Sequence, residues 1–326
     1  MAARQSSPVI GDLCYSDKDR EARTLDNLKL HHFDVTIGYR YQQSSRHFVG
    51  TVEQVQREIK HNQVENDLHM LDVSINYELN PRWSLTASLP MVTDKRNEPN
   101  NGIFRATGIG DATIGARFWI FRPPTESGGN ISFGFSLKMP TGQDNLTGHR
   151  RNGQLVTLDQ SIQPGDGGWG FALESQGFRQ TYFHTMLYYS GSYLFNPQGN
   201  NGVLTGTRTP GGQTMSIADQ YLYRGGLSHR VFNMKWLFAS IGGRMEGVPV
   251  RNAFGSSLGF RRPGYAIDVD PGFLVSMGKN IFSCNVPFAV ERNRTRSVSD
   301  IAAGNGRHGD AAFADYALLI SYSRHF

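Results

Sequence analysis

The chain has 326 residues, of which 38% are hydrophobic and 11% aromatic, and its mean hydropathy is −0.42. No apolar run approaches the roughly 20 residues that a membrane-spanning helix needs, so a helical membrane protein is excluded. The formal charge of +5 comes from acidic and basic residues that are interleaved along the chain, without a basic block or a nucleic-acid motif. We therefore expect no nucleic-acid partner.

The first 28 residues are polar and mixed in charge, and they show neither a strand nor a helix pattern. We interpret residues 1–28 as a periplasmic tail or a segment inserted into a lumen, and residues 29–326 as one domain. A basic stretch followed by an apolar one, as in a secretory signal peptide, is not visible. Export would require such a peptide, so we expect that it has been removed.

From residue 33 onwards, apolar and polar residues alternate, which is typical of β-strands with one apolar face. In the first segment, for example, Phe33, Val35 and Ile37 share one face, whereas Asp34 and Thr36 share the other. Twelve segments alternate in this way, although two carry large side chains on both faces and Leu222 breaks the pattern of a third. The segments are Phe33–Gln42, Leu71–Leu79, Trp83–Leu89, Asp111–Ile120, Ile131–Met139, Trp169–Glu174, Thr181–Phe195, Gln220–Ser228, Met234–Glu246, Tyr265–Ser276, Phe282–Glu291 and Asp315–Ser323.

The connections between these segments alternate in length. Short ones lie near Asn80 and at Arg122–Asn130, Phe178–Gln180, His229–Asn233 and Gly278–Asn280. Long polar ones lie at Gln43–Glu65, Val92–Thr107, Thr141–Asp166, Asn196–Ser216, Gly247–Arg262 and Arg292–Ala311. Short periplasmic turns and long extracellular loops are typical of a membrane barrel, and a sheet that spans lipid must close on itself. The sequence therefore predicts an all-β transmembrane antiparallel β-barrel of about twelve strands, with both termini in the periplasm.

Two further features follow from this arrangement. Val52, Val55 and Ile59 have helical spacing within the first long loop, which predicts a short amphipathic helix packed on the barrel rim. The apolar faces of the strands are expected to contact lipid. The residues chosen to represent that face are Val73, Ile75, Phe133, Phe135, Val269 and Leu318.

The polar faces carry ionisable residues that we expect to point into the lumen. They are Asp34, Arg40, Asp72, Glu78, Asp111, Arg117, Lys138, Glu174, Arg224, Arg244, Glu246, Asp268 and Asp270. These residues either line a solute path and set its selectivity, or pair across the lumen and fill it. In both interpretations a basic set faces an acidic one. The basic set is Arg40, Arg117, Lys138 and Arg224, and the acidic set is Asp72, Asp111, Asp268 and Asp270.

The chain ends in Tyr322-Ser323-Arg324-His325-Phe326. A terminal Phe preceded by alternating aromatic or apolar residues resembles the signal that the bacterial barrel-assembly machinery reads. We therefore interpret Tyr322 and Phe326 as an assembly signal. This predicts the bacterial outer membrane as the location, and outer-membrane lipid, lipopolysaccharide and the assembly machinery as partners.

Three segments resemble the family of MetA-pathway of phenol degradation proteins, which are outer-membrane transporter-like barrels. The segments are Gly108–Phe118, Ser136–Gly142 and Gly165–Phe171, in the order and spacing expected of that family. The resemblance implies a barrel and a role in transport, and it supplies no catalytic residues.

The leading functional hypothesis is an outer-membrane channel or transporter for the passive passage of small solutes. The family name alone suggests aromatic or apolar ones. The alternative is a structural or interaction barrel with a plugged lumen, whose loops or tail bind an envelope protein. An enzyme is not expected, because no motif singles out a nucleophile held by a His–acid pair. Neither a cofactor nor a metal site is expected, since Cys14 and Cys284 lie far apart and outside any CxxC motif.

Overall fold

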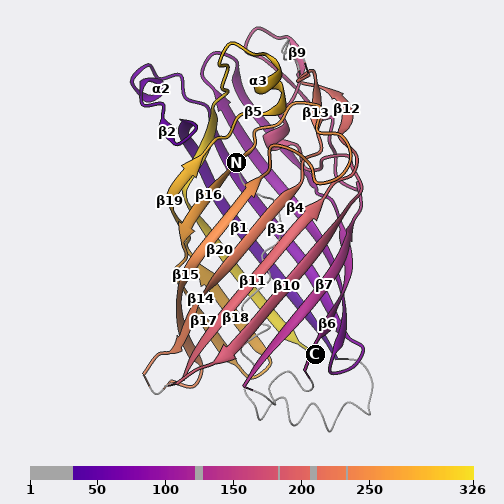
Figure 1. Ribbon diagram of the computed structural model, residues 1–326, viewed down its shortest axis with the longest axis vertical. Coiled ribbons are helices and arrows are strands. Elements are labelled where there is room, and N and C mark those ends of the chain that lie inside the picture. The colour runs from indigo at the N-terminus through magenta and orange to yellow at the C-terminus, as the bar shows by residue number, and fades with distance from the viewer. Residues whose placement is uncertain (1–31, 122–127, 183, 206–210, 233) are drawn as a thin grey trace.

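The protein is one antiparallel sheet that closes on itself where the first strand pairs with the last (Figure 1). The computed structural model describes residues 32–121, 128–182, 184–205, 211–232 and 234–326. The predicted tail, residues 1–28, lies outside these ranges. The closed antiparallel barrel and its twelve wall strands confirm the predicted fold class.

Several wall strands are interrupted, and each interrupted strand is represented by two elements. The wall strands are β1 (His32–Val49), β3 (Glu65–Glu78), β4 (Trp83–Glu98), β5 with β6 (Gly102–Ile109, Thr113–Trp119), β7 (Gly129–Lys138), β10 (Gly170–Gln180), β11 (Thr185–Phe195), β14 (Gln220–Arg230), β15 (Leu237–Val248), β16 with β17 (Gly264–Val269, Gly272–Met277), β18 with β19 (Asn280–Asn285, Phe288–Asn293) and β20 (Ala311–His325). The remaining elements are β2 (Val52–Glu53), β8 (Thr147–His149), β9 (Leu155–Thr157), β12 (Asn200–Leu204), β13 (Thr214–Ser216), the helices α2 (Gln56–Ile59) and α3 (Val298–Ala302), and the 3-10 helix η2 (Gln160–Ile162). Among the described helices, none is long and apolar enough to cross a membrane.

The alternation predicted from sequence corresponds to an inner and an outer face. On β7, Ser132 is fully buried, whereas Phe133 and Phe135 are 55% and 53% exposed on the outside of the barrel. Ile75 and Val269 are also exposed, and Val73 and Leu318 are half-buried. An exposed apolar belt on a closed barrel is the surface that contacts lipid in membrane barrels.

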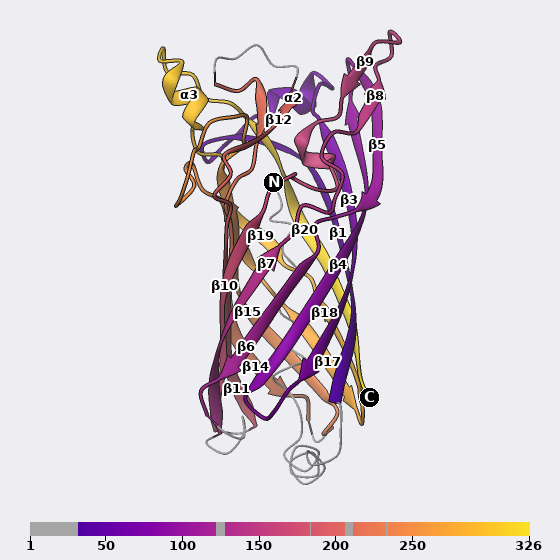
Figure 2. The ribbon, with the colours of Figure 1, turned by 90° about the vertical axis from the view of Figure 1, so that its right-hand side faces the viewer.

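The two ends of the barrel differ, as predicted, and we call them the turn end and the loop end. The C-terminus lies at the turn end, where short connections join the strands (Figure 1). The small helices and the short strands β8, β9, β12 and β13 gather at the loop end (Figure 2). The two ends of the barrel therefore present surfaces of different kinds.

Three predicted boundaries are wrong. Strand β1 continues to Val49, so the loop expected at Gln43–Glu65 begins with sheet. Strands β4 and β5 form a tight hairpin around residues 99–101, so the loop expected at Val92–Thr107 is largely sheet. The turn expected at Phe178–Gln180 is the end of β10, which pairs there with β7 and β11. Backbone pairing continues in each case although the apolar alternation has ended, because ladder hydrogen bonds do not depend on side-chain polarity.

The helix predicted around Val52, Val55 and Ile59 is only partly present. Helix α2 spans four residues and buries none of them. Val52 lies in β2, and the side chains of Val52, Val55 and Ile59 are exposed and do not pack on the rim. A single helical turn cannot present a continuous apolar stripe, because the residues of such a stripe recur over several turns.

Two neighbouring strands are interrupted at proline, which has no amide hydrogen for the ladder. Pro271 separates β16 from β17, and Pro287 separates β18 from β19. Asn285 connects the two sites, because its side-chain amide donates to Asp270 Oδ1 at 3.1 Å. Beyond these prolines, β19 pairs with β20 only at Phe288 and Tyr316 among the described residues.

Candidate functional site: the lumen and its two ends

Two adjoining chambers occupy the lumen. The upper chamber, toward the loop end, has a volume of about 460 Å³, and the lower chamber has a volume of about 180 Å³. Residues from six strands line both chambers and so mark their junction. They are Met70, Asp72, Ser88, Thr113, Ser136, Glu174 and Ser192. The junction is polar, with four hydroxyl groups and two carboxylates.

Of the predicted lumen residues, Arg40, Asp72, Arg117 and Arg224 line the lower chamber. Asp72, Asp111 and Lys138 line the upper one. Arg244, Asp268 and Asp270 are buried beside the chambers without lining them, and Glu78 is half-buried at the end of β3. Glu174 lines both chambers, and Glu246 is buried beside them. Asp34 is buried against His325 and lines neither chamber, so the structure brings most of the set together and leaves Asp34 and Glu78 apart.

The buried arginines on the inner wall are held by carboxylates. Arg40 donates to Glu246 Oε1 at 2.6 Å, and Arg244 donates to Glu246 Oε2 at 2.8 Å. Arg224 Nε lies 2.8 Å from Asp270 Oδ2, and its guanidinium carbon lies 5.5 Å from the centre of the Tyr188 ring. Buried charges persist when they are paired in this way.

A second group of charges joins the three segments on which the family resemblance rests. Asp111 accepts hydrogen bonds at 3.0 Å from the backbone amides of Gly142 and Asp166. The ammonium group of Lys138 contacts Asp166 and lies 4.0 Å from Asp111. A Cβ atom at Gly142 would lie 2.8 Å from Gly165 Cα, so the two backbones approach more closely than other residues allow.

The remaining basic residues of the two chambers are also paired. Arg117 lies 3.5 Å from Glu174, and Arg57 lies 2.5 Å from Asp310. The carboxylate of Asp72 differs from those that hold the arginines. Its Oδ1 accepts a hydrogen bond of 2.5 Å from the Ser88 hydroxyl. Asp72 forms no ion pair with any residue in the described part of the chain.

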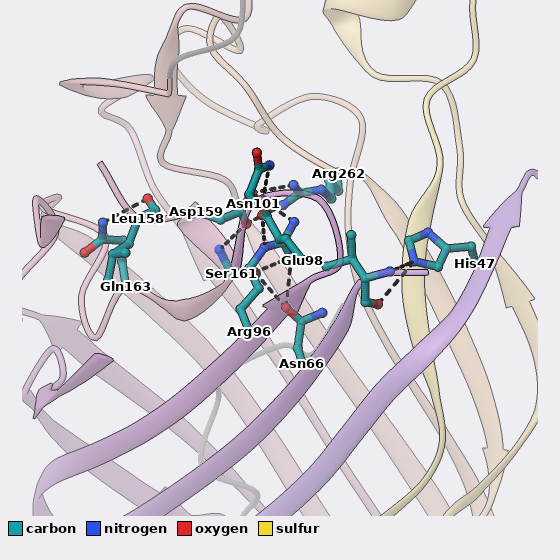
Figure 3. Close-up of polar contacts among 11 residues, drawn as sticks. His47, Asn66, Arg96, Glu98, Asn101, Leu158, Asp159, Ser161, Gln163 and Arg262 are labelled. Atoms are coloured by element: carbon teal, nitrogen blue, oxygen red, sulfur yellow. Dashed lines mark hydrogen bonds and ion pairs between the residues drawn. The ribbon is translucent and has the colours of Figure 1, made fainter. Parts of the chain in front are cut away.

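The mouth of the lumen at the loop end is crossed by residues 158–164, which we call the strap. Asp159 accepts two hydrogen bonds from Arg262, at 2.8 and 2.6 Å, and Arg96 lies 3.5 Å from the same carboxylate (Figure 3). Arg96 also donates to Asn66 at 2.9 Å, which ties the strap to β3 and β4. Strap residues from Gln160 to Pro164 form part of the upper chamber wall.

Apolar packing supports the strap from one side. Leu158 and Ile162 are buried against Phe104 and Ala106 of β5. The side-chain amide of Gln163 donates at 3.1 Å to the carbonyl groups of Leu146 and Leu158. The strap is therefore a packed element with its own small core.

Large apolar side chains fill the lumen at the turn end. Phe178, Tyr188, Leu274 and Ile281 form a buried cluster, and Trp119, Met186 and Phe238 pack against it. Glycine makes room for the Tyr188 ring, because a Cβ atom at Gly226 or Gly242 would lie within 3 Å of the Tyr188 hydroxyl. The lumen is narrowed here by packing, whereas at the mouth it is narrowed by ion pairs.

The predicted assembly signal lies at the turn end, where the barrel closes. The Phe326 ring stacks on Phe33 with a centroid distance of 4.9 Å, and the Phe326 amide donates to the Phe33 carbonyl at 3.0 Å. Tyr322 is exposed and donates to Asn280 Oδ1 at 2.8 Å. Both side chains remain on the outside of the barrel.

The sequence did not identify two groups of residues that shape the lumen. One is the apolar cluster at the turn end, and the other is the set of strap contacts around Asp159. Leu222, which broke the alternation, is buried inside the barrel, but it pairs with Ser192 of β11 and does not belong to that cluster. No pattern signalled the second, since the partners of Asp159 come from distant loops. Among the described residues, no group of three or more His, Cys, Asp or Glu side chains could hold a metal ion.

Comparison with known proteins gives the fold. No family model matches the sequence, and no curated protein matches it either. An outer membrane channel from Pseudomonas putida F1 is similar with a TM-score of 0.63 and 12% identity, covering 91% of this chain and 96% of that one. The beta domain of the Bordetella autotransporter Brka is similar with a TM-score of 0.50 and 13% identity, covering 91% and 100%. The barrel implied by the family resemblance is confirmed, whereas the family itself stays a prediction.

Proposed function

We propose that this protein is an outer-membrane channel through which small solutes pass passively, with its loop end outside the cell. The observation that carries the proposal is the pair of adjoining chambers inside a closed barrel. Chambers of a few hundred Å³ accommodate small molecules. The similar structure from Pseudomonas putida F1 is itself an outer membrane channel.

Small solutes with an apolar or aromatic part fit the upper chamber best. Its wall includes Met70, Val92, Leu194 and Val248, and Ile162 of the strap adds to them. Hydroxyl groups and two carboxylates at the junction supply hydrogen bonds for a polar group on the same molecule.

The same proposal includes the partners of the barrel, which are the membrane around it and the machinery that assembles it. The exposed apolar belt, with Ile75, Phe133 and Val269, would contact outer-membrane lipid and lipopolysaccharide. Tyr322 and Phe326 would be read by the barrel-assembly machinery before the chain folds.

The second candidate is a barrel with a plugged lumen that binds an envelope protein. The narrow ends favour it, because the strap crosses the mouth and the apolar cluster fills the turn end. The two functions differ in whether a solute can cross the barrel at all.

Swelling of liposomes that contain the refolded protein tests the proposal. We expect uncharged pentoses to swell these liposomes faster than protein-free ones, and trisaccharides to produce no difference, because narrow ends exclude large solutes. Rates equal to those of protein-free liposomes for every sugar would favour the plugged barrel. A heat-dependent shift on a denaturing gel would establish that the inserted protein is folded.

A further inference from the structure

The charges that line the two chambers do not cancel at the junction. Within the described part of the chain, every basic side chain of the lining contacts a carboxylate. Arg40 contacts Glu246, Arg117 contacts Glu174, and Arg224 contacts Asp270, while the bases near the mouth contact Asp159, Asp166 and Asp310. An ion pair presents little net charge to a passing solute, because its two fields oppose each other.

Of the two carboxylates at the junction, Glu174 contacts Arg117, whereas Asp72 has no ion pair with any described residue. Asp72 lies on β3, lines both chambers, and accepts a hydrogen bond from the neutral hydroxyl of Ser88. A hydroxyl donor is neutral and so does not offset the charge of the carboxylate. Any solute that moves between the chambers must therefore pass an unbalanced carboxylate.

The low-dielectric wall strengthens the effect of this charge. Field lines from a charge inside a narrow lumen are confined by the surrounding protein and focused along the solute path. An anion at the junction is repelled and a cation is attracted, even though the whole chain carries a formal charge of +5. Selectivity here depends on the position of one charge, and the net charge of the chain does not predict it.

We infer that Asp72 makes the junction selective for cations, and that the preferred solutes are organic cations with an apolar body. This inference rests on the proposed channel function. The cationic group would contact the Asp72 carboxylate, while the apolar body would lie against Met70, Val92 and Leu194 in the upper chamber. Asp72 is thus a specificity-determining residue that contacts the solute.

Reversal potentials in planar bilayers test the inference. We expect the wild-type protein in a KCl gradient to show a higher permeability for K⁺ than for Cl⁻. When benzyltrimethylammonium replaces K⁺, it should carry current, whereas benzenesulfonate in place of Cl⁻ should carry much less. These two probes are permanently charged, so neither crosses the lipid itself.

Three variants separate the charge from its surroundings. D72N should lower the ratio of cation to anion permeability about 25-fold, because a unit charge near 4 Å in a watery environment favours the cation about fivefold and disfavours the anion about fivefold. D72E keeps the charge and should keep the preference. E58Q removes a carboxylate from the exposed helix α2 and should leave the ratio unchanged. High salt should reduce the wild-type ratio through screening.

The failures can be told apart. A channel that conducts without a cation preference, or whose preference survives in D72N, would overturn the role of Asp72 and leave the channel function standing. Folded protein that never conducts, in wild-type form and in a variant with a loosened strap, would overturn the channel function and this inference together.

Discussion

Neighbouring residues on β7 have opposite environments. Ser132 is fully buried inside the barrel, and Phe133 is 55% exposed on the outer face. A charged side chain at Phe133 would lose its hydration in the lipid. We expect F133R to lower the free energy of unfolding by about 2–4 kcal/mol, measured by urea titration in lipid vesicles.

The matched control is the same change on the inner face. Ser74 lines the lower chamber, where an arginine could keep water or find a carboxylate. S74R should therefore be mild by comparison. Equal losses in F133R and S74R would mean that the two faces are wrongly assigned.

The terminal residue, Phe326, allows a test of how the barrel is assembled. Phe326 is 47% exposed and stacks on Phe33, so its burial should contribute less than the about 1.5–3 kcal/mol of a fully buried large side chain. A stable barrel should tolerate that loss. We expect deletion of Phe326 to reduce the amount inserted in cells, whereas the purified protein still refolds in detergent.

Two assays on one deletion variant make this prediction specific. Quantifying surface-exposed protein reports assembly, and refolding yield reports stability. Normal surface levels would contradict the assembly-signal role. Equal modest losses in both assays would mark Phe326 as an ordinary residue of the closing ladder.

Among the elements, the strap combines its small apolar core with the ion pairs of one carboxylate. Asp159 binds Arg262 at two positions and lies near Arg96. We expect D159N to destabilise the strap by about 1–3 kcal/mol, less than the about 3–5 kcal/mol for breaking a fully buried pair. Hydrogen exchange at residues 158–164 should accelerate while the wall strands keep their protection.

A second ion pair near the same end provides the control. Lys95 lies 3.2 Å from Asp67 and is substantially exposed, so this pair should contribute little. D67N should leave exchange in the strap unchanged. Unchanged exchange in D159N as well would indicate that apolar packing of Leu158 and Ile162 holds the strap alone.

The strap should also be insensitive to moderate acid. Burial would raise the pKa of Asp159, but the charges of Arg262 and Arg96 and the hydrogen bonds from Arg262 and the Ser161 amide outweigh it and hold that pKa well below its ordinary value. Such a group stabilises the strap above its unfolded-state pKa of about 3.9, and the contribution is lost only as pH falls through the folded-state value. Strap protection, corrected for intrinsic exchange rates, should therefore be flat from about pH 5 to pH 8. A loss near neutral pH would contradict this account.

The sequence predicts elements well where side chains alternate and poorly where they do not. The alternation of apolar and polar residues located a segment of every wall strand. This alternation arises because one face of each strand contacts lipid and the other faces the polar lumen. It failed for the β4–β5 hairpin, whose ladder extends past the apolar belt. It also could not predict the strap, since Asp159 and Arg262 are far apart in sequence and only the folded loops bring them together.

Across the whole molecule, the sequence predicts which residues point inward and not how they pair. The alternation of apolar and polar residues along β1 and β14 placed Arg40 and Arg224 on the polar face. Their partners, Glu246 and Asp270, depend on the stagger and radius of the closed barrel, which no single strand encodes. The absence of an ion pair at Asp72 could not be predicted for the same reason.

The barrel is narrow at both ends and open between them. The strap and the apolar cluster at the turn end limit the size of a solute, whereas the chambers provide the space for it. Loosening the strap should widen the path without altering the wall. The channel function therefore predicts a relation between strap stability and conductance that a plugged barrel would not show.

Single-channel recording from purified, refolded protein in planar bilayers tests the central claim most directly. We expect the wild-type protein to produce discrete, small conductance steps, and D159N to produce larger ones under the same conditions. Silence of both proteins at every voltage, with their folded state established by heat-dependent gel migration, would contradict a continuous path through the lumen.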